Sequence, residues 1–203
     1  MLRSSLLSEL TWIDHGFGTR TDVVPQDAMA RLKQIHSAVV LAVDCAGVAG
    51  EGDALVTAQD RVPVSVRTAD CYPILLVDTR NRAVAAVHAG WRGTAGRIVV
   101  RTIEQMLERY GTEPADLRVA IGPGIGGCCY DVGIEVARQF GLEHAGKIDL
   151  AEINHRLLVE NGVAAQRIQV LGGCTLCDAQ LFHSFRRDRE LAGRMVSYIG
   201  IAE

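Results

Sequence analysis

The feature that most constrains the fold is a strand with no polar side chain, Ala83–Val87, that runs directly into a glycine-rich turn. A strand without polar residues belongs in a sheet that is covered on both faces. We therefore predict a buried strand that ends at His88, a turn that carries Trp91 and Arg92, and a helix over Thr94–Tyr110. Side chains at such a strand end can face a cleft while the sheet holds them still.

Composition indicates an ordinary globular chain. It has 203 residues and a formal net charge of −3, so we expect no general affinity for nucleic acid or anionic membranes. No apolar run approaches the ~20 residues of a membrane span, and Met1–Trp12 lacks the pattern of a secretory signal. We expect a cytoplasmic protein whose six cysteines are thiols or metal ligands, with residues 1–203 forming one α/β domain around a mixed sheet.

Apolar and β-branched runs predict the remaining strands: Gln34–Val43, Asp53–Thr57, Val62–Val66, Pro73–Asp78, Leu117–Ile121, Ile168–Leu171 and Arg194–Ile201. Helical signals are found at four further places: a turn at Ala28–Lys33, a helix from Asp131 to about Phe140, a helix over Asp149–Asn161, and a stop at Gly162. The glycines of Ala46–Asp53 indicate a loop. Pro73–Asp78 and Ala83–Val87 are expected to form a β-hairpin.

Three residues of metal-ligand type lie next to predicted strands: His36, Cys71 and His88. Imidazole and thiolate are good zinc ligands, but these three lie too far apart along the chain for a zinc finger. They suit a site assembled by tertiary structure, in which three protein ligands leave a fourth position open as in catalytic zinc centres. Each residue alone is also compatible with a packed or hydrogen-bonded role.

A glycine loop follows the strand Leu117–Ile121 and matches G-x-G-x-x-G at Gly122, Gly124 and Gly127. That pattern is typical of dinucleotide binding when a helix follows. Pro123 within the loop is unusual for that function, so we favour a tight turn packed near the site.

The other cysteines leave several interpretations open. Cys174 and Cys177 form a C-x-x-C, but Cys128 and Cys129 are adjacent, which is the wrong spacing for the second pair of a structural zinc site. We predict buried thiols here, with a redox or second-metal role as the alternative. Cys45 is predicted to be a small core residue.

Six motifs occur in order along most of the chain: Gln34-Ile-His36-Ser, Gly52-Asp-Ala-Leu-Val-Thr57, Thr68-Ala-Asp-Cys71-Tyr-Pro, Val87-His88-Ala-Gly-Trp-Arg-Gly93, Gly122-Pro-Gly-Ile-Gly-Gly-Cys-Cys-Tyr130 and Leu181-Phe-His-Ser-Phe-Arg-Arg-Asp188. Together they resemble the laccase-domain family, also called multicopper polyphenol oxidase-like or peptidoglycan-editing-factor-like proteins. In that family the corresponding His, Cys and His bind one zinc. The resemblance therefore implies His36, Cys71 and His88 as metal ligands.

The resemblance also implies a fold and a function. The fold would be a single α/β (α+β) domain in which mixed β-sheet layers are flanked by helices, a CNF1/YfiH-like sandwich. Members are described as purine nucleoside phosphorylases that also deaminate adenosine and phosphorolyse methylthioadenosine. Purine nucleosides and phosphate would then be the ligands of a monomer or homodimer, and zinc the cofactor, with copper possible in vitro because it outcompetes zinc at many N/S sites.

Several residues are compatible with that chemistry. Arg20, Arg92 and the helix start after Gly93 could bind phosphate, and Trp91 or Tyr72 could stack on a purine. This chain has only Thr21–Lys33 between the Thr-Arg turn and the Gln-x-His strand, where family members usually have a longer segment. One wall of the substrate pocket is therefore expected to differ.

Asp70 is the nearest candidate for a proton carrier, or for a partner that orients a ligand His. Arg186 and Arg187 are a short basic pair, expected either on the solvated surface or at the rim of the pocket.

Three other functions remain open. A multicopper oxidase needs many His ligands, mostly in His-x-His pairs, whereas this chain has six His and no such pair, which leaves a copper-binding polyphenol oxidase weakly supported. A zinc-free amidase that edits peptidoglycan precursors would use Cys71 as nucleophile and His88 as base. A non-catalytic nucleotide-binding module is the third alternative.

Overall fold

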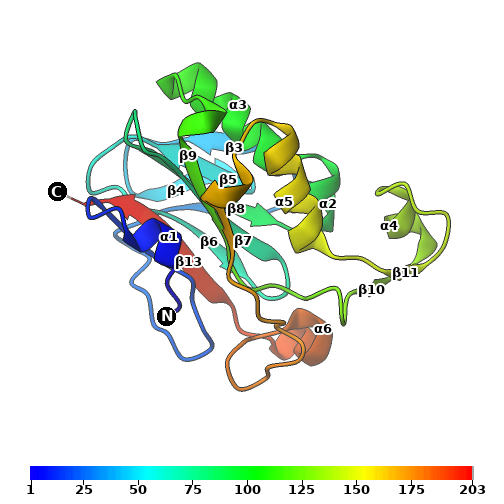
Figure 1. Ribbon diagram of the computed structural model, residues 1–203. Helices are drawn as coiled ribbons and strands as arrows, with labels where there is room; N and C mark the ends of the chain where they lie inside the picture. The colour runs from blue at the N-terminus through cyan, green and yellow to red at the C-terminus, as the bar shows by residue number, and fades with distance from the viewer. Residues whose placement is uncertain (203) are drawn as a thin grey trace.

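The computed structural model describes residues 1–202, and two β-sheets stacked face to face form its body (Figure 1). The first sheet has the strand order β1 (Ile13–Gly16), β13 (Met195–Ile201), β6 (Val64–Thr68), β2 (Ala30–Lys33), β4 (Gly47–Glu51). The second has the order β12 (Ile168–Val170), β9 (Leu117–Ile121), β7 (Tyr72–Asp78), β8 (Ala83–Ala89), β5 (Ala54–Thr57), β3 (Val40–Ala42). Both sheets mix parallel and antiparallel pairs.

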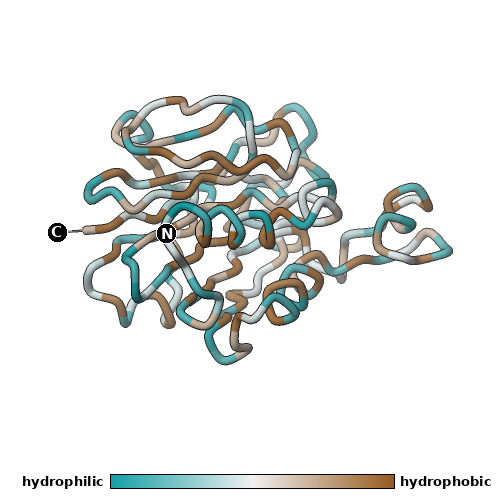
Figure 2. Tube along the Cα trace, turned by 90° about the horizontal axis from the view of Figure 1, so that it is seen from above, coloured by the Kyte–Doolittle hydropathy of each residue, from teal (hydrophilic) through white to brown (hydrophobic). Residues whose placement is uncertain are grey.

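Helices cover the outer face of the second sheet (Figure 1). They include α2 (Trp91–Ala95), α3 (Ile98–Tyr110) and α5 (Leu150–Glu160), while α1 (Ser5–Ser8), α4 (Ile134–Arg138) and α6 (Phe185–Asp188) are short. Three 3₁₀ turns complete the set: η1 (Pro114–Asp116), η2 (Ala165–Arg167) and η3 (Arg189–Leu191). In Figure 2 residues 131–147, which hold α4 and the small pair β10 (Asp131–Val132) and β11 (Gly146–Lys147), extend away from this body.

The apolar pattern of β7 explains the layered packing. Ile74 and Leu76 point to the helices, where they pack in one core cluster with Ile103 of α3. Leu75 and Val77 point the other way and pack against the first sheet in a second cluster. Because both faces are covered, β7 and β8 are buried along their whole length, as the absence of polar residues in Ala83–Val87 predicts.

Several predicted elements are confirmed. The hairpin of β7 and β8 is antiparallel, and β9 has the predicted bounds. Helix α5 follows Asp149, whose carboxylate accepts hydrogen bonds from Ala151 N at 2.9 Å and Glu152 N at 3.1 Å. Strands β5, β6, β12 and β13 also lie where apolar runs predict them, within about two residues at each end. The predicted mixed α/β layering is therefore correct.

The predicted continuous helix Thr94–Tyr110 is wrong, because the chain breaks between α2 and α3. Arg97 adopts a left-handed conformation with φ of 59°. Gly96 lies so close to the neighbouring loop that a Cβ there would be 3.0 Å from the Cβ of Ala38. The helical periodicity is real on both sides of the break, but tertiary packing bends the chain at this point.

Four other local predictions need correction. Ala28–Lys33 and Ala46–Asp53 contain the parallel strands β2 and β4 instead of a helical turn and a loop. Gln34–Val43 is a strand only over β3, because its first half forms a loop with His36 at φ of 56°. Asp131 opens β10, and α4 begins only after Gly133. In each case pairing or loop contacts with distant residues override local propensity.

Two cysteine predictions are also wrong. Cys45 is exposed instead of buried in the core. Cys128 and Cys177 are exposed, while Cys129 and Cys174 are partly buried, so these four are not buried thiols.

Within residues 1–202, no helix combines the length and the hydropathy that crossing a membrane requires.

We predict that Asp149→Ala lowers the free energy of unfolding by about 1 kcal/mol, the usual cost of losing an N-cap side chain. Asp149→Asn keeps an acceptor for the same two backbone N–H groups and serves as the matched control. Urea unfolding of both variants provides the measurement. Equal midpoints for the two would show that the carboxylate does not stabilise α5 through its cap.

Candidate active site

The structure brings His36, Cys71 and His88 together. One ligand atom from each lies within 4.8 Å of the others, and the two imidazole rings are 4.9 Å apart at their centroids, in an edge-to-face arrangement. His88 lies near the end of β8, Cys71 directly precedes β7, and His36 lies in the loop between β2 and β3. The pairing of β7 with β8 sets Tyr72 opposite Ala89, which places Cys71 beside the residue that follows β8.

That residue is Gly90, and the site requires it to have no side chain. A Cβ at Gly90 would lie 2.8 Å from the Sγ of Cys71 and 3.5 Å from the Nδ1 of His36. The backbone φ of Gly90 is −82°, which any residue adopts. The glycine of the His-Ala-Gly-Trp stretch is therefore needed for space, so that thiolate and imidazole can approach one point.

Asp53, which was not among the predicted site residues, orients two of these residues. Its buried carboxylate lies 2.8 Å from the Nδ1 of His88 and accepts hydrogen bonds from the backbone N–H groups of His36 at 3.1 Å and Ser37 at 2.5 Å. The bond to Nδ1 leaves the Nε2 of His88 to face a ligand. The available signal was an aspartate in the Gly52–Thr57 motif directly before the buried strand β5.

The electrostatics of this cluster favour a charged pair. Burial alone would raise the pKa of the Cys71 thiol, but hydrogen bonds with His36 and His88 outweigh it and lower the pKa to about 6. Burial alone would lower the pKa of His88, but Asp53 and Cys71 raise it to about 9. Burial likewise raises the pKa of Asp53, whereas hydrogen bonds from His88 and Ser37 lower it to about 2. At neutral pH Cys71 is thus a thiolate, the form that binds metals.

His36, Cys71 and His88 lie in the wall of a cavity of about 590 Å³. Its other lining residues are rich in arginine and aromatic side chains: Gln34, Arg67, Ala69, Asp70, Trp91, Arg92, Ile125, Tyr130, Leu150, Phe185, Arg186, Arg189 and Arg194. The guanidinium of Arg92 lies 4.2 Å from the Trp91 ring, and that of Arg186 lies 5.4 Å from the Tyr130 ring. Such a lining suits a ligand that combines an anionic group with a flat ring.

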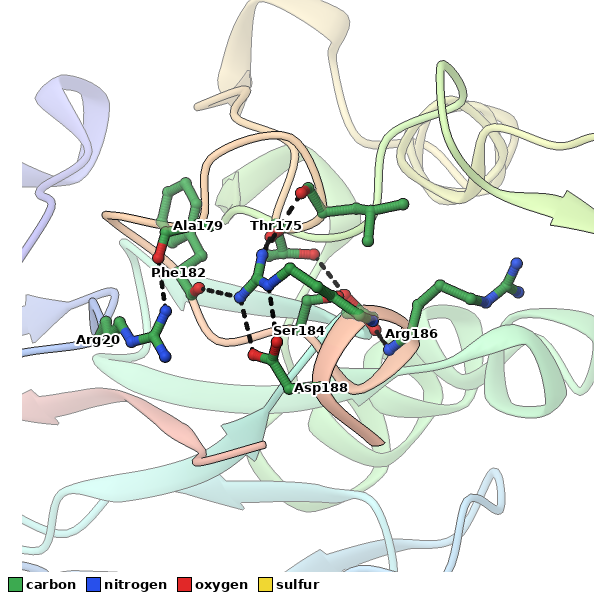
Figure 3. Close-up of polar contacts among 10 residues, drawn as sticks. Arg20, Thr175, Ala179, Phe182, Ser184, Arg186 and Asp188 are labelled. Atoms are coloured by element: carbon green, nitrogen blue, oxygen red, sulfur yellow. Dashed lines mark hydrogen bonds and ion pairs between the residues drawn. The ribbon is translucent and has the colours of Figure 1, made fainter. Parts of the chain in front are cut away.

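The structure separates the predicted substrate residues into two groups. Trp91 and Arg92, the candidates for stacking and for anion binding, line the cavity. Tyr72 does not, since it is buried and its hydroxyl donates to the Ile125 carbonyl at 3.0 Å. Arg20 is also absent from the lining, and its guanidinium donates to the Ala179 carbonyl at 2.6 Å (Figure 3).

Asp70 lines the cavity but does not orient a ligand histidine. Its carboxylate accepts hydrogen bonds from the Thr175 hydroxyl and from the backbone N–H of Arg186, both at 2.6 Å. The orienting role considered for Asp70 therefore belongs to Asp53. Asp70, the residue before Cys71, instead connects the strand end that carries Cys71 to the loops at Thr175 and Arg186.

The side chains of the basic pair Arg186 and Arg187 make different contacts. Arg186 extends to the cavity, whereas Arg187 points into its own loop and donates to the Thr175 and Phe182 carbonyls, both at 2.9 Å. In Figure 3 the labelled Arg186 guanidinium extends away from the loop that holds Thr175 and Phe182. Tyr130, Arg189 and Arg194 also line the cavity, and the sequence offers a signal only for Tyr130, which lies in the motif Gly122–Tyr130.

Comparison with known proteins identifies the family. Residues 18–202 match the family described as multi-copper polyphenol oxidoreductase laccase. The chain belongs to this family. The resemblance inferred from its motifs is thereby confirmed.

Three relatives of this chain carry informative names. A Deinococcus radiodurans protein named purine nucleoside phosphorylase is 44% identical over 185 residues, which cover 86% of this chain and 71% of that protein. A protein of an unknown prokaryotic organism, named adenosine deaminase RL5, is 38% identical over 81% of this chain and 71% of its own length. The crystal structure of YlmD from Geobacillus stearothermophilus aligns with a TM-score of 0.83 and 34% identity, covering 88% of this chain and 75% of that one. The fold predicted from the family resemblance is therefore correct.

We predict that alkylation of Cys71 in chelator-treated protein has its midpoint near pH 6. The rate with iodoacetamide should be low below that pH, where the thiol is protonated, and should reach its plateau by neutral pH, because only the thiolate reacts. Peptide mass spectrometry across a pH series gives the rate at Cys71 alone. His88→Gln should move the midpoint upward; a wild-type midpoint near the ordinary thiol value of about 8.5 would contradict the assignment.

Proposed function

We propose that this chain is a zinc-dependent purine nucleoside phosphorylase that also deaminates adenosine and phosphorolyses methylthioadenosine. The observation that carries the proposal is the convergence of His36, Cys71 and His88 in the wall of a cavity rich in arginine and aromatic residues. The names of the Deinococcus and RL5 relatives support the two reaction types.

The donor set fits a zinc ion. One thiolate and two imidazoles are typical zinc ligands, Asp53 fixes one ring as an outer-shell carboxylate does in zinc proteins, and Gly90 leaves the space that the ion would need. Because only three protein ligands would hold the ion, a fourth coordination position would remain open. When bound, zinc supplies Lewis acidity and lowers the pKa of a water at that position toward ~7.

The cavity's own residues would bind and orient the substrates. Arg92 and Arg186 present guanidinium groups that can hold phosphate through paired hydrogen bonds, and Trp91 offers a ring face for the purine.

In phosphorolysis a phosphate oxygen forms a bond to C1′ of the ribose while the C1′–N9 bond breaks, and the electron pair of the broken bond leaves with the base. In deamination water adds at C6 of adenine and ammonia leaves. Asp70, the acidic residue of the lining, would carry the proton.

One observation also favours a second candidate. Cys71, His88 and Asp53 form a chain of nucleophile, base and orienting carboxylate, the arrangement of a Cys–His hydrolase such as the amidase of peptidoglycan editing. The two functions make opposite demands on Cys71, since a metal-bound thiolate is not a free nucleophile. Metal content therefore separates them.

We predict that His88→Ala loses the bound zinc of this centre together with nucleoside turnover. The fold should persist because a catalytic metal contributes less to folding than a structural one. His88→Gln keeps a polar partner for Asp53 and guards against unfolding caused by an unpaired buried carboxylate. Elemental analysis and a nucleoside panel with and without phosphate, analysed by mass spectrometry, provide the readouts. Full phosphorolysis in either folded variant would refute the metal mechanism, and binding without turnover in the wild type would favour a nucleotide-binding module.

Arg92→Ala should raise the phosphate concentration needed for half-maximal rate by about 10- to 100-fold, the value of losing one charged hydrogen-bonding partner. The KM for the nucleoside should change much less. Arg80→Ala is the matched control, since Arg80 is exposed in the β7–β8 turn, at the opposite end of β7 from Cys71. An unchanged phosphate dependence would remove Arg92 from the phosphate site.

A further inference from the structure

A second cluster of metal-binding side chains lies outside the candidate active site. The Sγ atoms of Cys128, Cys129, Cys174 and Cys177 all lie within 4.8 Å of one another. The separations are 3.6 Å between Cys128 and Cys129, 3.8 Å between Cys128 and Cys177, and 3.2 Å between Cys129 and Cys177. Four of the six cysteines of the chain therefore form one cluster, although they belong to two segments, 128–129 and 174–177, that lie far apart in the sequence.

Strand pairing explains how the two segments meet. The glycine loop follows β9 and the C-x-x-C follows β12, and these strands are parallel neighbours in which Val170 pairs with Ile121. Parallel strands end at the same edge of a sheet, so both loops leave it side by side. A bridge between Gly124 and Cys174, with Thr175 N donating to Gly124 O at 3.0 Å, continues the pairing into the loops.

The geometry suits a tetrahedral thiolate site. Four sulfurs bound to zinc at about 2.3 Å in a tetrahedron lie roughly 3.8 Å from one another, close to two of the three separations given above. The backbone N–H of Gly126 donates to the Sγ of Cys174 at 3.3 Å, a contact that favours a negatively charged sulfur. A Cβ at Gly126 would lie 3.3 Å from the Sγ of Cys128, so the glycine keeps this space open.

We propose that Cys128, Cys129, Cys174 and Cys177 bind a structural zinc ion that joins the glycine loop to the C-x-x-C loop. Zinc is the expected metal because four thiolates in a closed tetrahedral set are typical of structural zinc sites. Binding replaces the thiol protons, which are released to solvent. A disulfide is the competing state of the same sulfurs, and it would need an oxidant.

The ion would also stabilise one wall of the cavity. Ile125 and Tyr130, which line the cavity, lie in the same loop as Cys128 and Cys129. Thr175, between the two cysteines of the C-x-x-C, donates to the carboxylate of Asp70, the neighbour of Cys71. The glycine loop thus lines the cavity, and the C-x-x-C loop contacts one of its lining residues, although none of the four cysteines lines it.

Zinc content tests the site separately from the proposed function, which needs the His36, Cys71 and His88 centre. In protein purified without chelator, elemental analysis should give two zinc ions per chain in the wild type. The double variant Cys174→Ser/Cys177→Ser should retain one, as should His88→Ala, each losing a different ion. Cys45→Ser, which removes an exposed cysteine outside the cluster, should keep both.

The double variant should also unfold at a lower temperature than the wild type, because the zinc links two loops. Should it fail to fold, Cys177→His keeps a zinc ligand and is expected to retain both ions where Cys177→Ser loses one. Equal zinc in the folded double variant and the wild type would overturn the site, as would a Cys129–Cys177 disulfide found after alkylation under denaturing, chelating conditions. If the wild type instead holds one zinc that His88→Ala keeps and the double variant loses, the structural site stands and the proposed catalytic metal fails.

Discussion

The buried carboxylate of Asp53 is the interaction on which the candidate active site depends. Removing a charge from water costs several kcal/mol unless its oxygens are fully hydrogen-bonded. The Asp53 carboxylate meets that condition, because it is hydrogen-bonded to the His88 ring and accepts hydrogen bonds from the backbone N–H and hydroxyl of Ser37. It also accepts a hydrogen bond from the backbone N–H of His36. The Asp53 side chain therefore orients the His88 imidazole and also stabilises the loop that carries His36. The left-handed conformation of His36 is held by these same bonds.

The sheet determines where these groups can meet. Asp53 precedes β5, His88 lies near the end of β8, and Cys71 precedes β7, so antiparallel neighbours bring all three to one edge of the second sheet. The parallel pair β9 and β12 brings the glycine loop and the C-x-x-C to the same side, where Asp70 joins them through Thr175. The interiors of β5, β7 and β8 are apolar and buried, while polar residues at or beside their ends form the candidate site. The cavity is thus built from strand ends and the loops that follow them.

The sequence was most informative where local pattern and tertiary context agree. The run of alanine and valine before His88 predicts a doubly covered strand, and Asp149 followed by an amphipathic stretch predicts α5; both are found. Strands β2 and β4 were missed, because pairing with each other stabilises them more than their own propensity does. The role of Asp53 could not be recognised locally, since the residues it holds lie 16 and more positions away. The convergence of four cysteines likewise depends on strand order, which spacing in the sequence does not reveal.

The family description names copper oxidation, yet the surroundings of the three ligands argue for different chemistry. Two imidazoles and one thiolate are also the ligands of blue-copper electron-transfer sites, where a weak axial ligand such as Met completes a closed site. Here no Met is found among the described residues that line the cavity, and the ligands face about 590 Å³ of space edged by arginines. Among residues 1–202, the other group able to hold a metal consists of four cysteines, a soft set unlike the histidine clusters that oxygen reduction requires. A metal held by these three residues would have its open position beside the arginine-lined cavity, an arrangement that would suit polar bond cleavage better than electron transfer.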